Sequence, residues 1–158
     1  MSQVALLDVN VLVALFTPDH IHHDAAHGWF AEHRASGWAT CSITENGLVR
    51  VLAHPSLGAG LRTTEIADRM RRFRESGDHH FWNDRHPVSD ASFFNLDFVS
   101  SPRQVTDVHL LGIAVTNGGV LATFDDAIPW RAVRGASRDH VQVIGRAEGE
   151  TTGAPDDR

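Results

Sequence analysis

The sequence predicts an α/β fold in three layers (α/β/α), with a mostly parallel central sheet of four to five strands. Short apolar segments alternate with longer segments of helical periodicity along the chain. Glycine or proline follows several of the expected helices, which is where such helices usually end. The 158 residues suit one domain, and a chain of that length can fold without disulfides or structural metals.

The N-terminal third of the chain is predicted to form one strand and two helices. Residues 4–7 are all apolar and suit a short buried strand. Residues 11–16 continue as an apolar helix, which Pro18 stops. A second helix is expected at 24–34, and Gly37 ends it.

The middle of the chain is predicted to contain a strand, two helices and a further strand. A strand at 38–41 leads into a helix at 42–53, which ends before Pro55. The segment 63–74 has apolar residues at helical spacing and is expected to form an amphipathic helix. Residues 79–82 suit a short edge strand.

The C-terminal third is less regular. Segment 83–102 has no clear period, although a short helix is expected at 90–95 within it. The next helix is expected to begin at Arg103 or Thr106 and to end at about Thr116, before a pair of glycines. The last two strands are expected at 120–124 and 141–144.

Composition predicts a soluble cytoplasmic protein that does not contact a membrane. Residues 1–146 are expected to form the domain, and 147–158, which contain almost no apolar side chain, a disordered tail. The single cysteine, Cys41, cannot form an internal disulfide and fits a reducing compartment. The start of the chain has no basic leader, and its apolar segments are too short to span a membrane.

The net charge of −6 does not favour a broadly basic surface for nucleic acid. The positive charges are unevenly placed, however, because five arginines lie between Arg62 and Arg74. All fourteen basic residues are arginine, whose planar fork of donors suits phosphate.

Four acidic residues occur where an expected strand ends or an expected helix begins. They are Asp8, Glu45, Asp107 and Asp125. In an open α/β sheet, the carboxyl ends of the strands meet at one crevice, where ligands bind. Carboxylates gathered there repel one another, and their hard oxygen ligands select Mg²⁺ or Mn²⁺. The sequence therefore predicts a site for one or two divalent cations.

The segments around these acids resemble the four acidic motifs of PIN-domain ribonucleases. The resemblance is strongest to VapC-type toxins of the type II (VapBC) toxin–antitoxin systems, and it extends over residues 4–145. The segments are Leu7-Asp8-Val9-Asn10, Thr44-Glu45, Thr106-Asp107-Val108-His109-Leu110-Leu111 and Ala122-Thr123-Phe124-Asp125.

The resemblance implies a PIN-like fold and a metal-dependent endoribonuclease toxin that cleaves structured cellular RNA, such as a tRNA or an rRNA loop. It also implies a homodimer and a cognate VapB-type antitoxin. The four acids would be both catalytic residues and ligands of the metal. Supporting roles are expected for Asn10, Thr123 and Asp126. Contacts with the RNA backbone are expected for Arg69, Arg71, Arg72 and Arg74, although these arginines equally fit a solvated helix face.

Local structure offers a second interpretation of three of the acids. Ser42 and Glu45 fit a capping box at the start of a helix. Asp107 fits the positive end of a helix dipole. Asp125 fits an ordinary turn. The resemblance explains all four acids together.

Three other functions remain as alternatives. His23 and His27 have the spacing of two zinc ligands on one helix face, as in zinc hydrolases. Asp8 and Asn10 match the start of an aspartyl phosphatase or a related Mg²⁺-dependent phosphoryl-transfer domain, which normally also uses a lysine that this chain lacks. A third alternative is a catalytically silent PIN domain that binds RNA or a protein partner.

Overall fold

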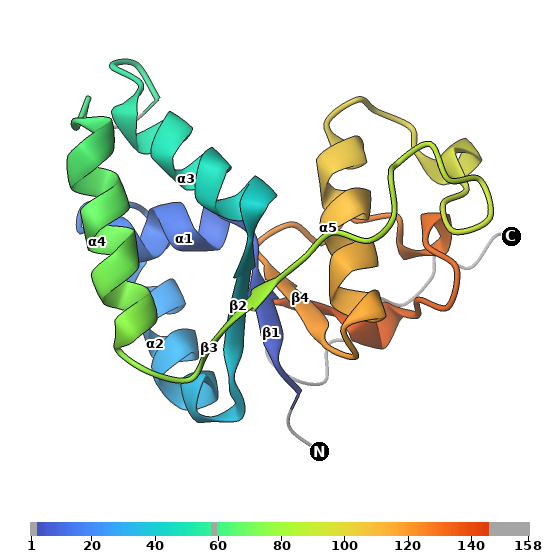
Figure 1. Ribbon diagram of the computed structural model, residues 1–158, viewed down its shortest axis with the longest axis horizontal. Helices are drawn as coiled ribbons and strands as arrows, with labels where there is room; N and C mark the ends of the chain where they lie inside the picture. The colour runs from blue at the N-terminus through green and yellow to red at the C-terminus, as the bar shows by residue number, and fades with distance from the viewer. Residues whose placement is uncertain (1–2, 58–59, 146–158) are drawn as a thin grey trace, which may run out of the picture.

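The computed structural model describes residues 3–57 and 60–145, and it has the predicted three-layer α/β/α architecture (Figure 1). Five strands form one sheet in the order β3-β2-β1-β4-β5, and every neighbouring pair is parallel. The strands are β1 (Ala5–Leu7), β2 (Trp38–Cys41), β3 (His79–Trp82), β4 (Val120–Thr123) and β5 (Val141–Val143). The helices are α1 (Val9–Phe16), α2 (His23–His33), α3 (Ser42–Ala53), α4 (Thr63–Glu75) and α5 (Gln104–Thr116). Short 3-10 helices lie at Arg34–Ser36, Leu96–Phe98, Trp130–Ala132 and Arg138–His140.

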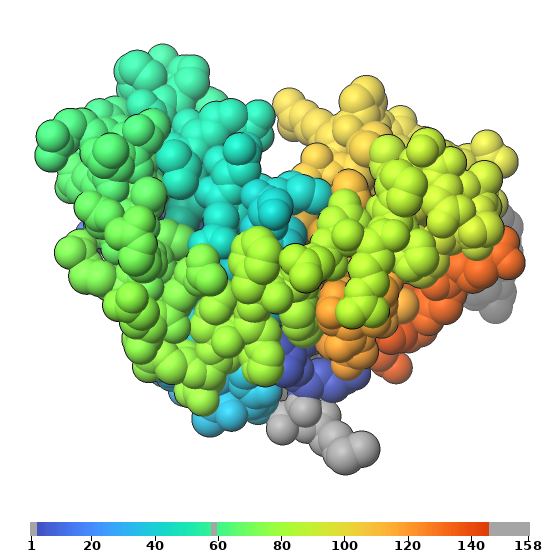
Figure 2. Space-filling model, viewed as in Figure 1, coloured from blue at the N-terminus to red at the C-terminus, as the bar shows by residue number. Residues whose placement is uncertain are grey.

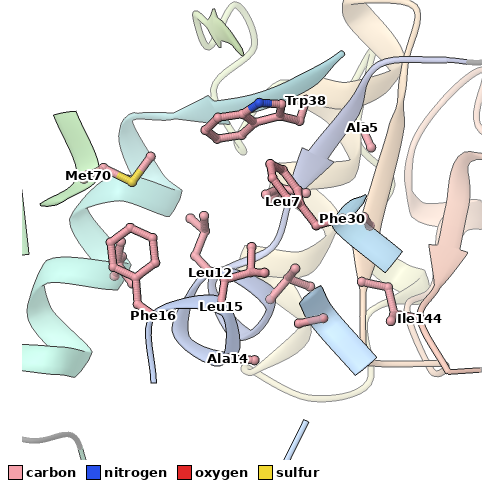
Figure 3. Packing of buried hydrophobic residues seen from close by; sticks show 14 of the residues in the cluster. Ala5, Leu7, Leu12, Ala14, Leu15, Phe16, Phe30, Trp38, Met70 and Ile144 are labelled. Carbon is pink, nitrogen blue, oxygen red and sulfur yellow. The ribbon is translucent and has the colours of Figure 1, made fainter. Parts of the chain in front are cut away.

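Helices cover both faces of the sheet, so its central strands β1, β2 and β4 are buried along their whole length, whereas the edge strands β3 and β5 are only partly buried. In β1, Ala5 and Leu7 point into a core that also contains residues of α1, α2, α3 and α4. Leu6 points the other way, into a second core against α5. Figure 3 shows the first core, where Leu7 and Trp38 of the sheet face the apolar side chains of the helices.

The chain changes direction across the sheet at β1. It runs from β1 to β2 and β3 on one side, and then returns to place β4 on the other side of β1. The gap between the carboxyl ends of β1 and β4 is therefore a topological switch point, where open α/β sheets bind ligands. Asp8 directly follows β1, and Asp125 lies two residues beyond β4.

Helix α5 begins at Gln104, between the two starts that the sequence allowed, and it ends at Thr116 as predicted. The glycine pair completes its C-terminus. Gly118 has a φ of 72°, a conformation that favours glycine, and the Gly119 N–H donates to Ala114 O at 2.9 Å.

The prediction of a short helix at 90–95 is wrong. The Asp90 carboxylate accepts hydrogen bonds from the backbone N–H and the hydroxyl of Ser92, at 3.0 and 2.6 Å, and these bonds hold the backbone in a turn. Phe94 then forms an isolated antiparallel bridge with Val133. The only helix between residues 83 and 102 is the 3-10 helix at Leu96–Phe98.

The expected boundary at 146 and the expected tail at 147–158 lie outside the described residues. No helix in the described part of the chain is long and apolar enough to cross a membrane.

Candidate active site

Asp8 is a buried carboxylate at the carboxyl end of the central strand. Its backbone is extended and its side chain caps α1, with Oδ1 accepting a 2.7 Å hydrogen bond from the Val9 N–H. Only 6% of the residue is exposed. Burial raises the pKa of Asp8, the hydrogen bonds from Thr123 and Val9 oppose that rise, and the charge of Asp125 adds to it. Because the cap sets the start of α1, this helix begins at Val9 rather than at residue 11.

Thr123 connects three parts of the site. It is fully buried, and its hydroxyl donates to Asp8 Oδ2 at 2.7 Å. The Thr123 hydroxyl oxygen also accepts hydrogen bonds, from the Asp125 backbone N–H at 3.1 Å and from Asn10 Nδ2 at 3.5 Å. Asp125 then accepts from the Ala127 N–H at 2.8 Å, which closes a turn after β4. The turn interpretation of Asp125 is thus correct locally, and it leaves the carboxylate beside Asp8.

Asp107 lies in the first turn of α5, at the same edge of the sheet. Burial raises its pKa to about 6, and the charges of Asp8 and Asp125 contribute to the rise. Three of the four predicted acids therefore lie within electrostatic range of one another. Figure 2 shows the molecule hollowed between the α3 side and the α5 side.

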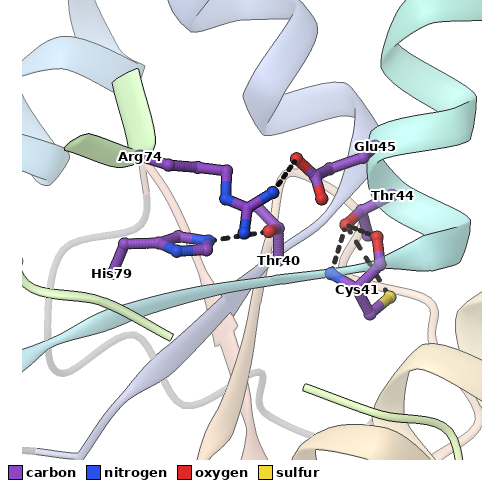
Figure 4. Close-up of polar contacts among 6 residues, drawn as sticks. All are labelled: Thr40, Cys41, Thr44, Glu45, Arg74 and His79. Atoms are coloured by element: carbon purple, nitrogen blue, oxygen red, sulfur yellow. Dashed lines mark hydrogen bonds and ion pairs between the residues drawn. The ribbon is translucent and has the colours of Figure 1, made fainter. Parts of the chain in front are cut away.

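Glu45 lies in the first turn of α3, but it does not cap that helix. The N-cap is Cys41, whose backbone N–H donates to Thr44 Oγ1 at 3.0 Å, so the capping box predicted for Ser42 and Glu45 is wrong. The Glu45 carboxylate instead pairs with Arg74 of α4, with 3.5 Å between Oε1 and Nη1 (Figure 4).

The oxygen donors of this site fit a hard divalent cation. The raised pKa values of Asp8 and Asp107 reflect buried like charges that such a cation would relieve. Asn10 Oδ1 is buried and has no hydrogen-bond partner among the described residues, so the site has an unused acceptor. Within residues 3–57 and 60–145, however, no three His, Cys, Asp or Glu side chains are already grouped to hold a metal ion. Asp126 is exposed next to the site, and its supporting role stays a prediction.

The two histidines with zinc-ligand spacing bond carbonyl oxygens at the end of α1 instead. His23 Nδ1 lies 2.8 Å from Ala14 O, and His27 Nε2 lies 3.0 Å from Leu15 O. These carbonyls belong to the last turn of α1, which has no further turn to bond them. The two rings therefore cap α1, and the structure does not support a zinc hydrolase.

The four arginines of α4 differ in their surroundings. Arg69 donates to Phe16 O at 3.1 Å and lies over the Phe16 ring, so it serves the packing of α1. Arg71 pairs with Asp68 on its own helix at 2.6 Å. Arg72 is exposed beside a pocket of about 310 Å³. Arg74 alone among them reaches one of the four predicted acids.

Two contacts at this edge were not predicted from the sequence. The Arg74–Glu45 pair joins residues 29 positions apart and has no local signal. Asp84, just after β3, bonds His109 of α5, with 2.6 Å between Oδ2 and Nε2. Asp84 lies in the segment without clear periodicity, although its position after an expected strand was a usable signal.

Comparison with known proteins gives a consistent result. A family model described as "PIN domain" matches residues 5–134. The chain is 38% identical over 140 residues to Ribonuclease VapC44 of Mycobacterium tuberculosis, covering 89% of this chain and 99% of the relative. It is 44% identical over 125 residues to Ribonuclease VapC39 of the same organism, covering 78% and 90%. A crystal structure of PAE2754 from Pyrobaculum aerophilum matches with a TM-score of 0.48 and 19% identity, over 87% of this chain and 90% of that one.

Proposed function

The chain belongs to the PIN domain family, and from this membership we propose that it is an endoribonuclease toxin of the VapC type. Relatives that match most of its length carry the name ribonuclease. The observation that carries the proposal is the convergence of Asp8, Asp107 and Asp125 at the switch point of the sheet, where the charge of Asp125 raises the pKa of Asp8 and the charges of both residues raise the pKa of Asp107.

The proposed catalytic residues are Asp8, Glu45, Asp107 and Asp125, which would hold one or two Mg²⁺ or Mn²⁺ ions. When bound, such a cation supplies positive charge and Lewis acidity at the scissile phosphodiester. Hydrogen bonds within the protein fix the orientation of a proposed metal-binding carboxylate before substrate binds. Asp8 is fixed by one hydrogen bond to each oxygen, from the Val9 N–H and from Thr123.

Asn10 and Asp126 are proposed as supporting residues. Asn10 donates to the Thr123 hydroxyl through Nδ2, and its Oδ1 is left as a buried acceptor beside the carboxylates. An acceptor in that place suits a water molecule held close to the cation. Asp126 follows Asp125 directly and is exposed, which suits a weaker contact at the rim.

The proposed substrate is a structured cellular RNA, a tRNA or an rRNA loop, since unpaired loops expose bases for recognition. The exposed arginines of α4 are the proposed contacts with its phosphates. The proposed partners are a VapB-type antitoxin and a second copy of this chain. The phosphatase and the silent-domain alternatives are not favoured, because the relatives are ribonucleases by name and all four acids are present.

The test is cleavage of total cellular RNA by the purified protein with Mg²⁺, Mn²⁺, Zn²⁺ or EDTA. Discrete products with 5′-phosphate ends in Mg²⁺ or Mn²⁺, and none in EDTA, support the proposal. The Asp8→Asn and Asp125→Asn variants should be folded and inactive. Cleavage that persists in excess EDTA, or in both variants, would place the reaction elsewhere.

A further inference from the structure

Within residues 3–57 and 60–145, Glu45 is the one proposed metal ligand that has a cationic partner. Its carboxylate lies 3.5 Å from the Arg74 guanidinium, and its side chain is 21% exposed. The charge of Asp125 acts on Asp8, and the charges of Asp8 and Asp125 act on Asp107. The ion pair with Arg74 directs the Glu45 carboxylate toward α4.

An aromatic ring and a neutral histidine lie beside the Arg74 guanidinium. Arg74 lies over the Phe81 ring, 5.4 Å from its centroid, in a cation–π contact. His79, next to it, bonds Thr40 Oγ1 through Nε2 at 2.7 Å (Figure 4). Burial and the charge of Arg74 lower the pKa of His79 to about 4, so this ring is neutral at physiological pH. Arg74 is therefore the cation in this group that neutralises Glu45.

We propose that Arg74 is an internal counter-ion of Glu45, and that a divalent cation entering the site must displace the guanidinium to use the Glu45 carboxylate. The proposal rests on the proposed function, because it needs the cation site at the acidic edge. Arg74 is then a positioning residue that acts through Glu45. It keeps the Glu45 carboxylate directed toward α4 while no cation is bound, and it therefore weakens the binding of the first cation.

The geometry suits displacement rather than a permanent structural tie. The contact is a single Nη1 to Oε1 approach at the upper end of hydrogen-bond distance, not a two-pronged pair. The Arg74 side chain is 41% exposed, so water can replace the carboxylate as its partner. Exposed pairs of this kind contribute little to stability, and carboxylate oxygens are common ligands of divalent cations.

The experiment is calorimetric titration of Mn²⁺ into the RNA-free protein, which needs no catalysis. Arg74→Gln should bind Mn²⁺ about two- to fivefold more tightly than wild type, and Arg74→Lys should lie between them. In a Glu45→Gln background, Arg74→Gln should have almost no effect, because the carboxylate under competition is gone. Arg71→Gln removes an equal charge from the same helix, and it should leave the Mn²⁺ affinity close to that of wild type.

The outcomes separate the two proposals. Unchanged or weaker Mn²⁺ binding in Arg74→Gln overturns the proposal that Arg74 is a counter-ion of Glu45. The proposal is also overturned if Arg74→Gln changes the Mn²⁺ affinity equally in wild type and in the Glu45→Gln background. If wild type binds no Mn²⁺, or Asp8→Asn binds it as well as wild type, the cation site itself is wrong. Thermal unfolding in EDTA checks that each variant folds. If Arg74→Gln does not fold, the Mn²⁺ titration of Arg74→Lys takes its place.

Discussion

The Thr123 hydroxyl donates a 2.7 Å hydrogen bond to the Asp8 carboxylate, joining residues that lie 115 positions apart. The bond crosses from β4 to the end of β1, and both residues are buried. It is one of the interactions that oppose the effect of burial on the pKa of Asp8. Thr123 therefore keeps Asp8 more acidic than its position alone would allow.

Replacing Thr123 by valine should separate this effect from packing, since the two side chains are nearly the same size. Loss of the hydroxyl should raise the pKa of Asp8 further and lower RNA cleavage about 10- to 100-fold. The free energy of unfolding at pH 8 should fall by about 1–3 kcal/mol, because a buried charge loses a donor. Thr123→Ser keeps the donor and should retain most of the activity. A loss in Thr123→Ser with none in Thr123→Val would indicate that the methyl group, not the hydroxyl, matters.

The carboxylate cluster should make stability depend on pH in metal-free buffer. Asp107 has its pKa raised from 3.8 to about 6, so the folded chain binds more protons than the unfolded chain between those values. Its contribution is complete below about pH 4 and is lost as the pH rises through about 6. Asp8 acts in the same direction.

Asp107→Asn should flatten this dependence by about 1 kcal/mol, a value reduced for solvent screening of a half-exposed group. The same variant should be inactive yet no less stable than wild type at pH 8. Urea unfolding in EDTA at several pH values measures the effect. Parallel curves for wild type and Asp107→Asn would show that this carboxyl titrates normally.

Much of the fold follows from local patterns in the sequence. The central strands β1, β2 and β4 are short and buried because helices cover both faces of the sheet, and the glycine pair after Thr116 ends α5 as predicted. The helix expected at 90–95 does not form, for a physical reason. The Asp90 side chain bonds Ser92 nearby, and Phe94 pairs with a residue almost forty positions away.

The candidate site was likewise only partly predictable from the sequence. Asp8 and Asp125 could be placed together because both follow parallel strands, and Asp107 because it begins a helix at that edge. The partner of Glu45 could not be predicted. Arg74 reaches it only because α4 packs beside α3, and nothing local in either helix specifies that contact.

The packing of α3 against α1 gives a prediction about the start of α1. A Cβ on Gly47 would lie 2.6 Å from Val9 Cγ2, and Val9 supplies the N–H that holds Asp8. Gly47→Ala should therefore displace Val9, lower the free energy of unfolding by about 1–3 kcal/mol and reduce cleavage. Gly28→Ala is the matched control, since Gly28 lies in α2 with nothing within 4 Å of the added atom. That change should stabilise by about 0.5–1 kcal/mol, and a destabilised Gly28→Ala would contradict the packing account.

Arg69 and Arg72 share one helix face beside the same pocket, yet the structure gives them different tasks. Arg69 donates to Phe16 O at the end of α1, where an unbonded carbonyl needs a donor, so Arg69→Gln should lower the thermal midpoint. Arg72 is exposed, and Arg72→Gln should leave the midpoint unchanged.

If α4 binds phosphates, Arg72→Gln should weaken binding of a hairpin RNA at every salt concentration and reduce the slope of log K against log salt by about one. Both variants are compared in an Asp8→Asn background, which prevents cleavage during the titration. A salt slope unchanged by Arg72→Gln would mean that this face of α4 is solvated and that RNA reaches the carboxylates over other residues. The Arg69 result stays informative in that case, because a hydrogen bond to a helix carbonyl stabilises the fold whether or not RNA binds.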